Sequence, residues 1–435
     1  MTITEYSNNS KPLKIAIIGA GLVGAVAGIA LSKLSNVNVT IYERSEKPRE
    51  VGAWIGLTES SLQVLRKLVD IDELQKILFR GDQDGGYVKR HWKTGEILAV
   101  NLSSTTTDRR LKQARTHRVP LHNFLFSYVP EGLIKYGYSA NKVNVTKDGV
   151  DVIFEEKDPI HADLLVAADG IYSRTRRQFT GDTVQYKGAV AYRNVFPIEL
   201  IKDIPSLPND TSAWVKDGDI MFFSPLGLDQ YGVVALVFDP EDVAKKFIWN
   251  ENTGEWGREH LRKHFADWDP IIDKVLKVMP DITSFPLETA PWLKDLTVGN
   301  RLAFVGDAAH PTSGAFGAGA QFGFGDVWAL YRSLQETVSN AYVDTGLPAE
   351  YDLHRALFLF NETRRHFLAR VEKQLGYDAD TYKRYISTAR NDKEWRARFR
   401  QVESPLEWMR ENNVEADFQR VVDEQGPFLR TIYID

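Results

Sequence analysis

The sequence of 435 residues contains no cysteine. This absence excludes disulfide frameworks, thiolate metal sites, iron–sulfur ligation and cysteine nucleophiles. It is consistent with a reducing compartment, and we expect a cytoplasmic protein. A chain of this length does not need disulfides, because it can bury a large hydrophobic core.

A strong excess of charge of one sign is also missing. The 54 Lys and Arg residues stand against 59 Asp and Glu residues, which gives a formal net charge of −5. Nucleic-acid surfaces and polybasic membrane patches need a positive excess, so we expect neither nucleic acid nor a membrane as a partner. A hydrophobic fraction of 43% is too high for a disordered chain. The length exceeds the roughly 250–300 residues that one core usually serves, so two domains are expected.

Only one stretch approaches a membrane span in hydrophobicity. Residues 15–32 are uncharged and follow Lys11 and Lys14, an arrangement that imitates a signal peptide. The stretch contains four glycines, however, and a strand-like segment follows at residues 37–42. This order indicates a strand, a glycine-rich turn and a helix of a folded domain instead.

The glycines form a loop with a specific spacing. Residues 14–18 are typical of a buried parallel strand, and Gly19, Gly21 and Gly24 follow in the pattern GxGxxG. The first glycine allows a tight turn, the second a close approach of a pyrophosphate, and the third close packing of the helix. The phosphates would meet free N–H groups at the positive end of that helix.

An acidic residue completes the pattern. Glu43 ends the next strand, nineteen residues after Gly24, where a carboxylate can accept hydrogen bonds from ribose hydroxyls. A glycine-rich turn that binds nothing would not need the strands, the helix and the acid at these distances. We therefore expect a dinucleotide site, and these residues alone leave NAD and FAD open.

Two further strand ends carry a carboxylate beside a glycine. Residues 162–168 lead into Asp169-Gly170, and residues 301–305 lead into Gly306-Asp307. Each motif places an acceptor where a strand ends and the backbone turns sharply. Either motif alone could be a helix N-cap, but capping does not explain all three motifs together.

With these motifs the chain resembles the family of single-component FAD-dependent aromatic hydroxylases, which contains p-hydroxybenzoate and salicylate hydroxylases. The resemblance extends from about residue 14 to about residue 370. It implies an α/β fold with a Rossmann-like FAD-binding domain, an inserted antiparallel-sheet substrate domain and C-terminal helices. It also implies that FAD is bound by Gly19, Gly21, Leu22, Val23, Gly24, Glu43, Arg44, Ala53, Gly56, Arg118, Asp169, Asp307, Gly317, Gly319 and Ala320.

The sequence departs from the family pattern at two places. Gly314 stands where relatives usually have a proline that flanks the substrate. Gly325 precedes Asp326 where the family commonly has Glu-Asp. Flavin binding is expected to survive both departures, whereas the details of the substrate pocket are expected to follow those of relatives less closely.

The resemblance also divides the chain into three parts. The FAD-binding domain is expected at residues 1–80, 102–182 and 290–375, the substrate domain at 81–101 and 183–289, and a helical C-terminal extension at 376–435. Residues 352–374 have the pattern of a long amphipathic helix, whose arginines, Arg364 among them, are expected on a solvated face. The extension covers the flavin domain or forms an interface, so a homo-oligomer is left open.

The middle of the chain consists of short strand-like segments separated by turns, which is typical of an antiparallel sheet. No histidine occurs between His161 and His260, so this sheet supplies no histidine base. The polar candidates that remain are Gln185, Lys187, Tyr192, Arg193 and Tyr231. Arg193 and Tyr231 resemble an Arg/Tyr pair that holds a phenolate in fungal phenol-dearomatising relatives, and the resemblance makes them the candidate catalytic residues. An arginine can pair with an anion and a tyrosine can relay a proton. The alternative interpretation is that Arg193 is a surface residue and that Tyr231 is a packed aromatic residue of a strand. We expect no metal site.

These expectations combine into an FAD monooxygenase that consumes NADH or NADPH and O₂ to hydroxylate a small phenolic aromatic acid. The Gly-Ala-Gly-Ala loop at residues 317–320 resembles the corresponding loop of salicylate hydroxylases, and this resemblance favours a hydroxybenzoate. Hydroxylation at the carboxyl-bearing carbon with loss of carbon dioxide, as in decarboxylating 4-hydroxybenzoate and salicylate 1-hydroxylases, is the specific hypothesis. Alternatives are a same-fold flavin monooxygenase on a heteroaromatic compound, a larger phenol or an alkene, and a non-enzymatic FAD-fold binding protein.

Overall fold

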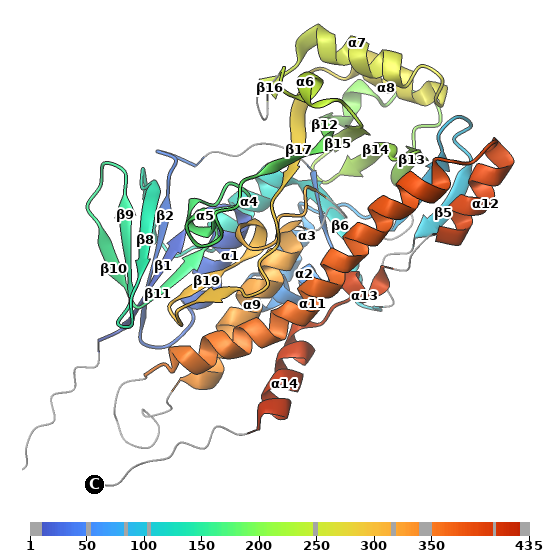
Figure 1. Ribbon diagram of the computed structural model, residues 1–435. Helices are drawn as coiled ribbons and strands as arrows, with labels where there is room; N and C mark the ends of the chain where they lie inside the picture. The colour runs from blue at the N-terminus through green and yellow to red at the C-terminus, as the bar shows by residue number, and fades with distance from the viewer. Residues whose placement is uncertain are drawn as a thin grey trace, which may run out of the picture.

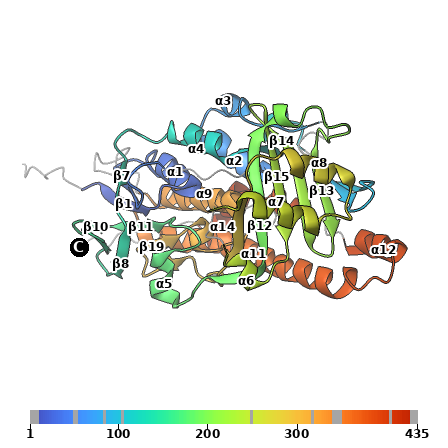
Figure 2. The same cartoon turned by 90° about the horizontal axis from the view of Figure 1, so that it is seen from above.

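The computed structural model describes residues 11–48, 54–81, 86–101, 106–246, 251–314, 319–338, 350–402 and 406–426, with the backbone alone at 377–383. Two large sheets dominate it, one of six strands and one of eight (Figure 1). Figure 2 shows the same arrangement from above, with helices α7 (Gly254–His264) and α8 (Pro270–Val278) over the eight-stranded sheet. The mixture of a parallel sheet, an antiparallel sheet and C-terminal helices confirms the predicted fold class.

The six-stranded sheet is parallel except at one edge. Its strands run in the order β18 (Thr297–Val298), β19 (Leu302–Phe304), β11 (Leu164–Ala167), β1 (Leu13–Ile18), β2 (Val37–Glu43) and β7 (Ile134–Tyr136). Only β18 and β19 pair antiparallel. Strands that are covered on both faces need apolar residues at consecutive positions, which is why β1 and β11 contain uninterrupted buried runs.

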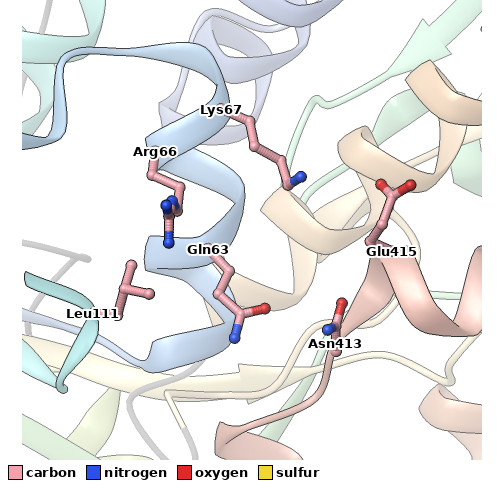
Figure 3. Close-up of a pocket in the computed structure, with 6 residues that line it drawn as sticks. All are labelled: Gln63, Arg66, Lys67, Leu111, Asn413 and Glu415. Atoms are coloured by element: carbon pink, nitrogen blue, oxygen red, sulfur yellow. The ribbon is translucent and has the colours of Figure 1, made fainter. Parts of the chain in front are cut away.

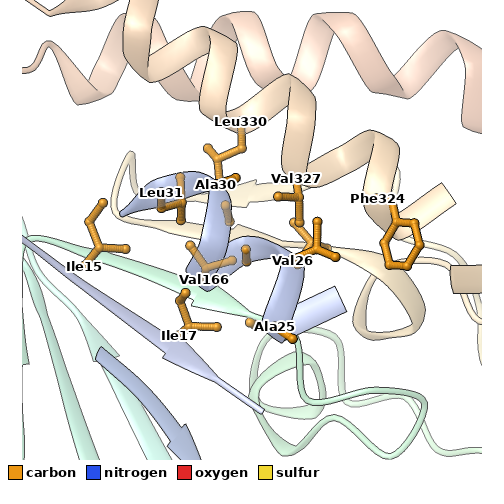
Figure 4. Close-up of a cluster of buried hydrophobic side chains, with 14 of the residues drawn as sticks. Ile15, Ile17, Ala25, Val26, Ala30, Leu31, Val166, Phe324, Val327 and Leu330 are labelled. Carbon is orange, nitrogen blue, oxygen red and sulfur yellow. The ribbon is translucent and has the colours of Figure 1, made fainter. Parts of the chain in front are cut away.

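Helices α1 (Leu22–Leu31) and α9 (Gly319–Thr337) cover this sheet. Ile17 of β1, Val26 of α1 and Val327 of α9 belong to one continuous hydrophobic core, which Figure 4 shows. Nine of the ten residues of α1 are buried, because the helix lies between the sheet and α9. Each fully buried aliphatic side chain stabilises the fold by roughly 1.5–3 kcal/mol.

The eight-stranded sheet is antiparallel except at one pair. Its strands run in the order β16 (Glu251–Asn252), β17 (Thr283–Thr289), β12 (Gln185–Pro197), β15 (Gln230–Val237), β14 (Asp219–Leu226), β13 (Thr211–Lys216), β4 (Tyr87–His91) and β5 (Ile97–Asn101). Only β13 and β4 are parallel. The outer face of the sheet packs against α6 (Glu241–Ala244), α7 and α8. Its inner face is turned toward the six-stranded sheet and its helices (Figure 1).

Smaller elements lie around and between the two sheets. The pair β3 (Trp54–Leu57) and β6 (Ala114–His117) contacts β14. A three-stranded sheet has the order β10 (Ile160–Ala162), β9 (Val150–Phe154) and β8 (Ala140–Val145). The remaining short elements are α2 (Glu59–Leu68), α3 (Ile71–Gln75), η1 (Arg109–Leu111), α4 (Arg118–Phe126), α5 (Arg174–Thr180), η2 (Ile198–Leu200) and η3 (Gly306–Ala308).

The C-terminal helices pack on both parts of the molecule. They are α11 (Leu353–Thr381), the π-helical turn η5 (Tyr382–Ile386), α12 (Asp392–Val402), α13 (Glu407–Arg410) and α14 (Val414–Gln425). The long helix α11 lies along α9 (Figure 1). Trp395 and Phe399 of α12 pack against Val215 of β13. Arg364 corrects one expectation, because it is only 1% exposed and pairs with Asp326 instead of lying on a solvated face. Among the helices that the structure describes, none is long and apolar enough to cross a membrane.

Candidate active site

The glycine loop turns sharply between β1 and α1. Gly19 has a φ of +99°, and a Cβ there would lie 2.6 Å from the carbonyl oxygen of Ala168. A Cβ on Gly24 would lie 1.9 Å from the carbonyl oxygen of Gly19. The packing of the protein itself therefore requires both glycines. A Cβ on Gly21, in contrast, would meet nothing within 4 Å, so the space at the N-terminus of α1 is open to a ligand.

Glu43 is attached to this loop from the end of β2. Its Oε2 accepts the N–H of Ala20 at 2.8 Å, and its Oε1 accepts the N–H of Ser45 at 2.9 Å. Each carboxylate oxygen has two lone pairs, so each can accept a further hydrogen bond from a ligand hydroxyl. The neighbouring Arg44 is exposed.

The Gly306-Asp307 turn lies against the same loop. Gly306 has a φ of +63°, and a Cβ there would lie 3.1 Å from Cγ2 of Val23 in α1. A Cβ on Gly319, the first residue of α9, would lie 3.3 Å from Oδ1 of Asp307. Asp307 is therefore adjacent to the N-terminus of α9.

Asp307 is a buried carboxylate with an unused acceptor. Its Oδ1 has no hydrogen-bond partner among the residues that the structure describes. Burial raises the pKa of this carboxyl, although the charges of His310, Arg118 and Arg176 act in the opposite direction. A buried oxygen without a partner is unfavourable by about 1–3 kcal/mol, so this position suits a hydroxyl donor of a bound ligand.

Arg176 joins the two aspartate motifs. Its Nη2 donates to the carbonyl of Ile171 at 2.9 Å, and its Nη1 lies 3.4 Å from the carbonyl of Asp307. Asp169 accepts the N–H of Thr175 at 3.2 Å, and burial raises the pKa of its carboxyl. The turns after β11 and β19 therefore form one polar site at the ends of neighbouring strands.

The other predicted cofactor residues surround this site or lie outside the described residues. Arg118 begins α4, and its charge influences the pKa of both Asp307 and Arg193. Leu22 is buried in α1, Gly56 lies in β3 opposite Arg115, and Ala320 is in the first turn of α9. Ala53 and Gly317 lie outside the described residues.

Arg193 lies on the inner face of the eight-stranded sheet. Its neighbour Tyr192 points to the outer face, where the hydroxyl donates to Asp239 at 2.8 Å. Because successive side chains of a strand point to opposite faces, Arg193 points to the inner face. The guanidinium carbon of Arg193 lies 3.2 Å from the ring centroid of Phe285, and the buried Nε has no hydrogen-bond partner among the described residues. Burial, together with the charge of Arg118, lowers the pKa of Arg193 to about 9. An anionic ligand beside this guanidinium would compensate its charge.

The structure does not bring Tyr231 together with Arg193. Arg193 is opposite Val234 in the ladder of β12 and β15, whereas Tyr231 is opposite Phe196, three residues further along β12. An odd offset places the two side chains on different faces of the sheet. Tyr231 is fully buried with Phe196 and Phe223 in the core between the outer face of the sheet and helices α6 to α8, which we call the outer core. This position agrees with the alternative interpretation of Tyr231 as a packed aromatic residue.

Aromatic side chains also lie at the inner face of the eight-stranded sheet. Trp54 of β3 and Phe222 of β14 meet edge to face, with ring centroids 6.3 Å apart. A Cβ on Gly232 would lie 3.2 Å from Cγ of Trp54, so this glycine provides room for the indole. Trp54 lies between Ala53 and Gly56, which the resemblance assigned to FAD binding. That Phe222 and Phe285 lie on this face is shown only by the fold.

A separate cavity of about 440 Å³ lies where α2 meets α14 (Figure 3). It is lined by Gln63, Arg66, Lys67, Leu111, Asn413 and Glu415. Glu415 accepts the indole N–H of Trp328 at 2.7 Å and pairs with Arg332 at 3.1 Å. These contacts attach α14 to α9, and we assign the cavity no ligand.

Comparison with known proteins identifies the class. A family described as FAD binding domain matches residues 12–358, and the chain therefore belongs to this family. The chain is 28% identical over 331 residues to 6-hydroxynicotinate 3-monooxygenase of Bordetella bronchiseptica, covering 74% of this chain and 83% of the relative. It is 27% identical over 358 residues to a salicylate hydroxylase of Pseudomonas putida, covering 77% and 80%. A solved salicylate hydroxylase substrate complex has the same fold, with a TM-score of 0.77 at 21% identity, covering 97% of this chain and 100% of that chain.

The protein is thus an FAD-dependent monooxygenase. More particularly, it is an aromatic monooxygenase of the salicylate and hydroxynicotinate hydroxylase type. The polar groups around the glycine loop fit the cofactor: Gly21 leaves open space at a helix N-terminus, and Asp307 offers a buried acceptor.

Proposed function

We propose that the enzyme hydroxylates an aromatic acid that bears a ring hydroxyl, at the expense of NADH or NADPH and O₂. The observation that carries this proposal is Arg193, a guanidinium on the inner face whose buried Nε has no partner among the described residues. The two relatives described above are named for aromatic acids with a ring hydroxyl, hydroxynicotinate and salicylate. An anionic substrate would supply the counter-charge that Arg193 lacks.

The chain's own residues can hold FAD along the edge of the six-stranded sheet. The free N–H groups before α1 would bind the pyrophosphate beside Gly21, and Glu43 would accept a ribose hydroxyl. Asp307 would accept a hydroxyl of the ribityl chain through its free Oδ1. The N-terminus of α9, at Gly319 and Ala320, would stabilise negative charge on the ring system. When bound, FAD supplies the electron transfer from the pyridine nucleotide and the delivery of one oxygen atom to the substrate.

The inner face of the eight-stranded sheet would orient the substrate. Arg193 would pair with the carboxylate or phenolate, and its stacking on Phe285 keeps the guanidinium in a fixed plane. Trp54 and Phe222 would flank the aromatic ring and exclude water. No comparable role falls to Tyr231, which is buried in the outer core.

The position of hydroxylation that we favour is the ring carbon that carries the carboxylate. The name 6-hydroxynicotinate 3-monooxygenase places the reaction at carbon 3, and in a nicotinate this carbon bears the carboxylate. One atom of O₂ would form a bond to that carbon, and the bond to the carboxyl carbon would break with carbon dioxide as the leaving group. The electron pair of the broken bond would stay with the ring, which regains its aromaticity as a phenol. The second oxygen atom would leave as water, with two electrons supplied by NADH or NADPH. A hydroxybenzoate would give a hydroquinone or a catechol in the same way.

Turnover by the FAD-loaded protein tests the proposal. NADH and NADPH oxidation would be measured with 6-hydroxynicotinate, salicylate and 4-hydroxybenzoate, with phenol and benzoate as controls that each lack one of the two groups. We expect strong stimulation by at least one hydroxylated acid and a product without the carboxylate. Stimulation by phenol equal to that by the acids would contradict the carboxylate as a recognition element. A product that keeps the carboxylate would contradict the position.

A further inference from the structure

Asp326 in α9 is a buried carboxylate that receives three donors. Its Oδ2 accepts the N–H of Gly306 at 2.8 Å and lies 2.6 Å from Nε2 of His310. Its Oδ1 accepts the Nε–H of Arg364 in α11 at 2.9 Å. The side chains of Asp326, His310 and Arg364 are at most 1% exposed. Although burial opposes it, the charges of His310 and Arg364 hold the pKa of Asp326 below its usual range.

These contacts hold both ends of one short turn. Gly306 and His310 are its first and last residues, and the N–H of His310 also donates to the carbonyl of Gly306 at 2.9 Å. Asp307 lies between them, beside the N-terminus of α9, with its Oδ1 unpartnered among the described residues. Asp326 therefore holds both ends of the turn that carries the Asp307 carboxylate.

Arg364 reaches Asp326 through space that a glycine leaves open. A Cβ on Gly325 would lie 3.1 Å from Nη2 of Arg364 and 3.2 Å from Cγ2 of Val414 in α14. Arg364 also donates to the carbonyl of Phe322 at 3.3 Å. The space taken by the guanidinium accounts for the glycine at position 325. Arg364 lies beyond residue 358, where the match to the FAD binding domain ends.

We propose that Asp326, His310 and Arg364 are positioning residues that hold Asp307 for its contact with FAD, and that Arg364 makes α11 part of the FAD-binding unit. The proposal rests on the proposed contact of Asp307 with the cofactor. It does not depend on which aromatic acid is the substrate.

Measurements of FAD binding to the full-length apoprotein test this proposal. The variants are Arg364→Met, Arg364→Lys, and the double variant Arg364→Met with Asp326→Asn, which removes both buried charges together. Loss of the residue that orients a metal ligand weakens metal binding by about 10–100-fold. By analogy, we expect a change of this size in the FAD dissociation constant of Arg364→Met and of the double variant. Arg364→Lys keeps one donor for Oδ1 and should recover at least part of the affinity. The circular dichroism of the bound flavin should change in the same order.

A neighbouring arginine provides the matched control. Arg365 pairs with Glu362 at the surface and is 43% exposed, so Arg365→Met should leave the dissociation constant and the spectrum unchanged. If Arg364→Met and the double variant bind FAD like the parent with an unchanged spectrum, the proposal is overturned. If Asp307→Asn binds FAD like the parent, its premise is wrong, and that result is distinct from any failure to turn over an aromatic acid.

Discussion

Tyr192 and Arg193 are neighbours in β12, and they show how the two faces of the eight-stranded sheet differ. On the outer face, the Tyr192 hydroxyl donates to Asp239, whose Oδ2 also lies 3.0 Å from Nε2 of His260. On the inner face, the buried Nε of Arg193 has no partner among the described residues. Buried polar groups are normally paired. The Tyr192 hydroxyl thus has its partner within the protein, whereas we propose that a bound ligand supplies the partner of Arg193.

The comparison predicts its largest effect for Arg193→Met. Loss of one member of a buried charged pair costs about 2–4 kcal/mol, so the KM for the aromatic acid should rise by about 30- to 1,000-fold. The melting temperature should not fall, because the variant removes a charged side chain whose buried Nε has no hydrogen-bond partner among the described residues. Steady-state kinetics and thermal unfolding measure both quantities. An unchanged KM would remove Arg193 from the substrate site.

Tyr192→Phe is the matched change on the outer face. The variant loses a hydrogen bond to a carboxylate, which contributes about 1.5–3 kcal/mol, and the free energy of unfolding should fall by that amount. The KM should stay within about twofold, because the hydroxyl points away from the inner face. Urea unfolding and the same kinetic assay check the two parts. A tenfold rise in KM would show that the faces are not independent.

The two faces should also differ in their dependence on pH. Burial and the charge of Arg118 lower the pKa of Arg193 to about 9, so its charge is present below pH 9 and is lost above it. Inhibition by benzoate, which stays ionised throughout, should weaken by up to about tenfold per pH unit above that value. The Arg193→Met variant should bind benzoate weakly at every pH. A parent enzyme whose benzoate inhibition is constant to pH 10 would contradict the assignment.

The candidate FAD site was predictable from the sequence because its backbone turns require particular residues. Contacts with nearby backbone leave no room for a side chain at Gly19 or Gly24. Such local constraints produce a spacing of glycines that can be read from the sequence. The fold class followed from the same motifs. The placement of Arg364 was not predictable, because its partner Asp326 and the space beside Gly325 depend on how α11 packs on α9.

The inner face was less predictable for a geometric reason. Whether two residues of neighbouring strands share a face depends on the register of the strands, and a shift of one residue reverses it. Arg193 and Tyr231 both lie in segments with strand patterns, but their opposite orientations follow only from the pairing of β12 with β15. The domain boundaries and the individual FAD contacts stay predictions.

Tyr231→Phe gives the smallest effect and the sharpest test of the comparison, because its hydroxyl also lacks a hydrogen-bond partner among the described residues. Unlike Arg193, it is neutral, its pKa is raised by burial, and Phe196 and Phe223 surround it in the outer core. Removing a buried hydroxyl without a partner should increase the free energy of unfolding by about 1 kcal/mol and leave kcat and KM within about twofold. Urea unfolding and steady-state kinetics measure these changes. A tenfold loss of kcat would instead mean that Tyr231 contacts the reacting ring. A polar group without a hydrogen-bond partner would then indicate a ligand on the outer face as well as on the inner face.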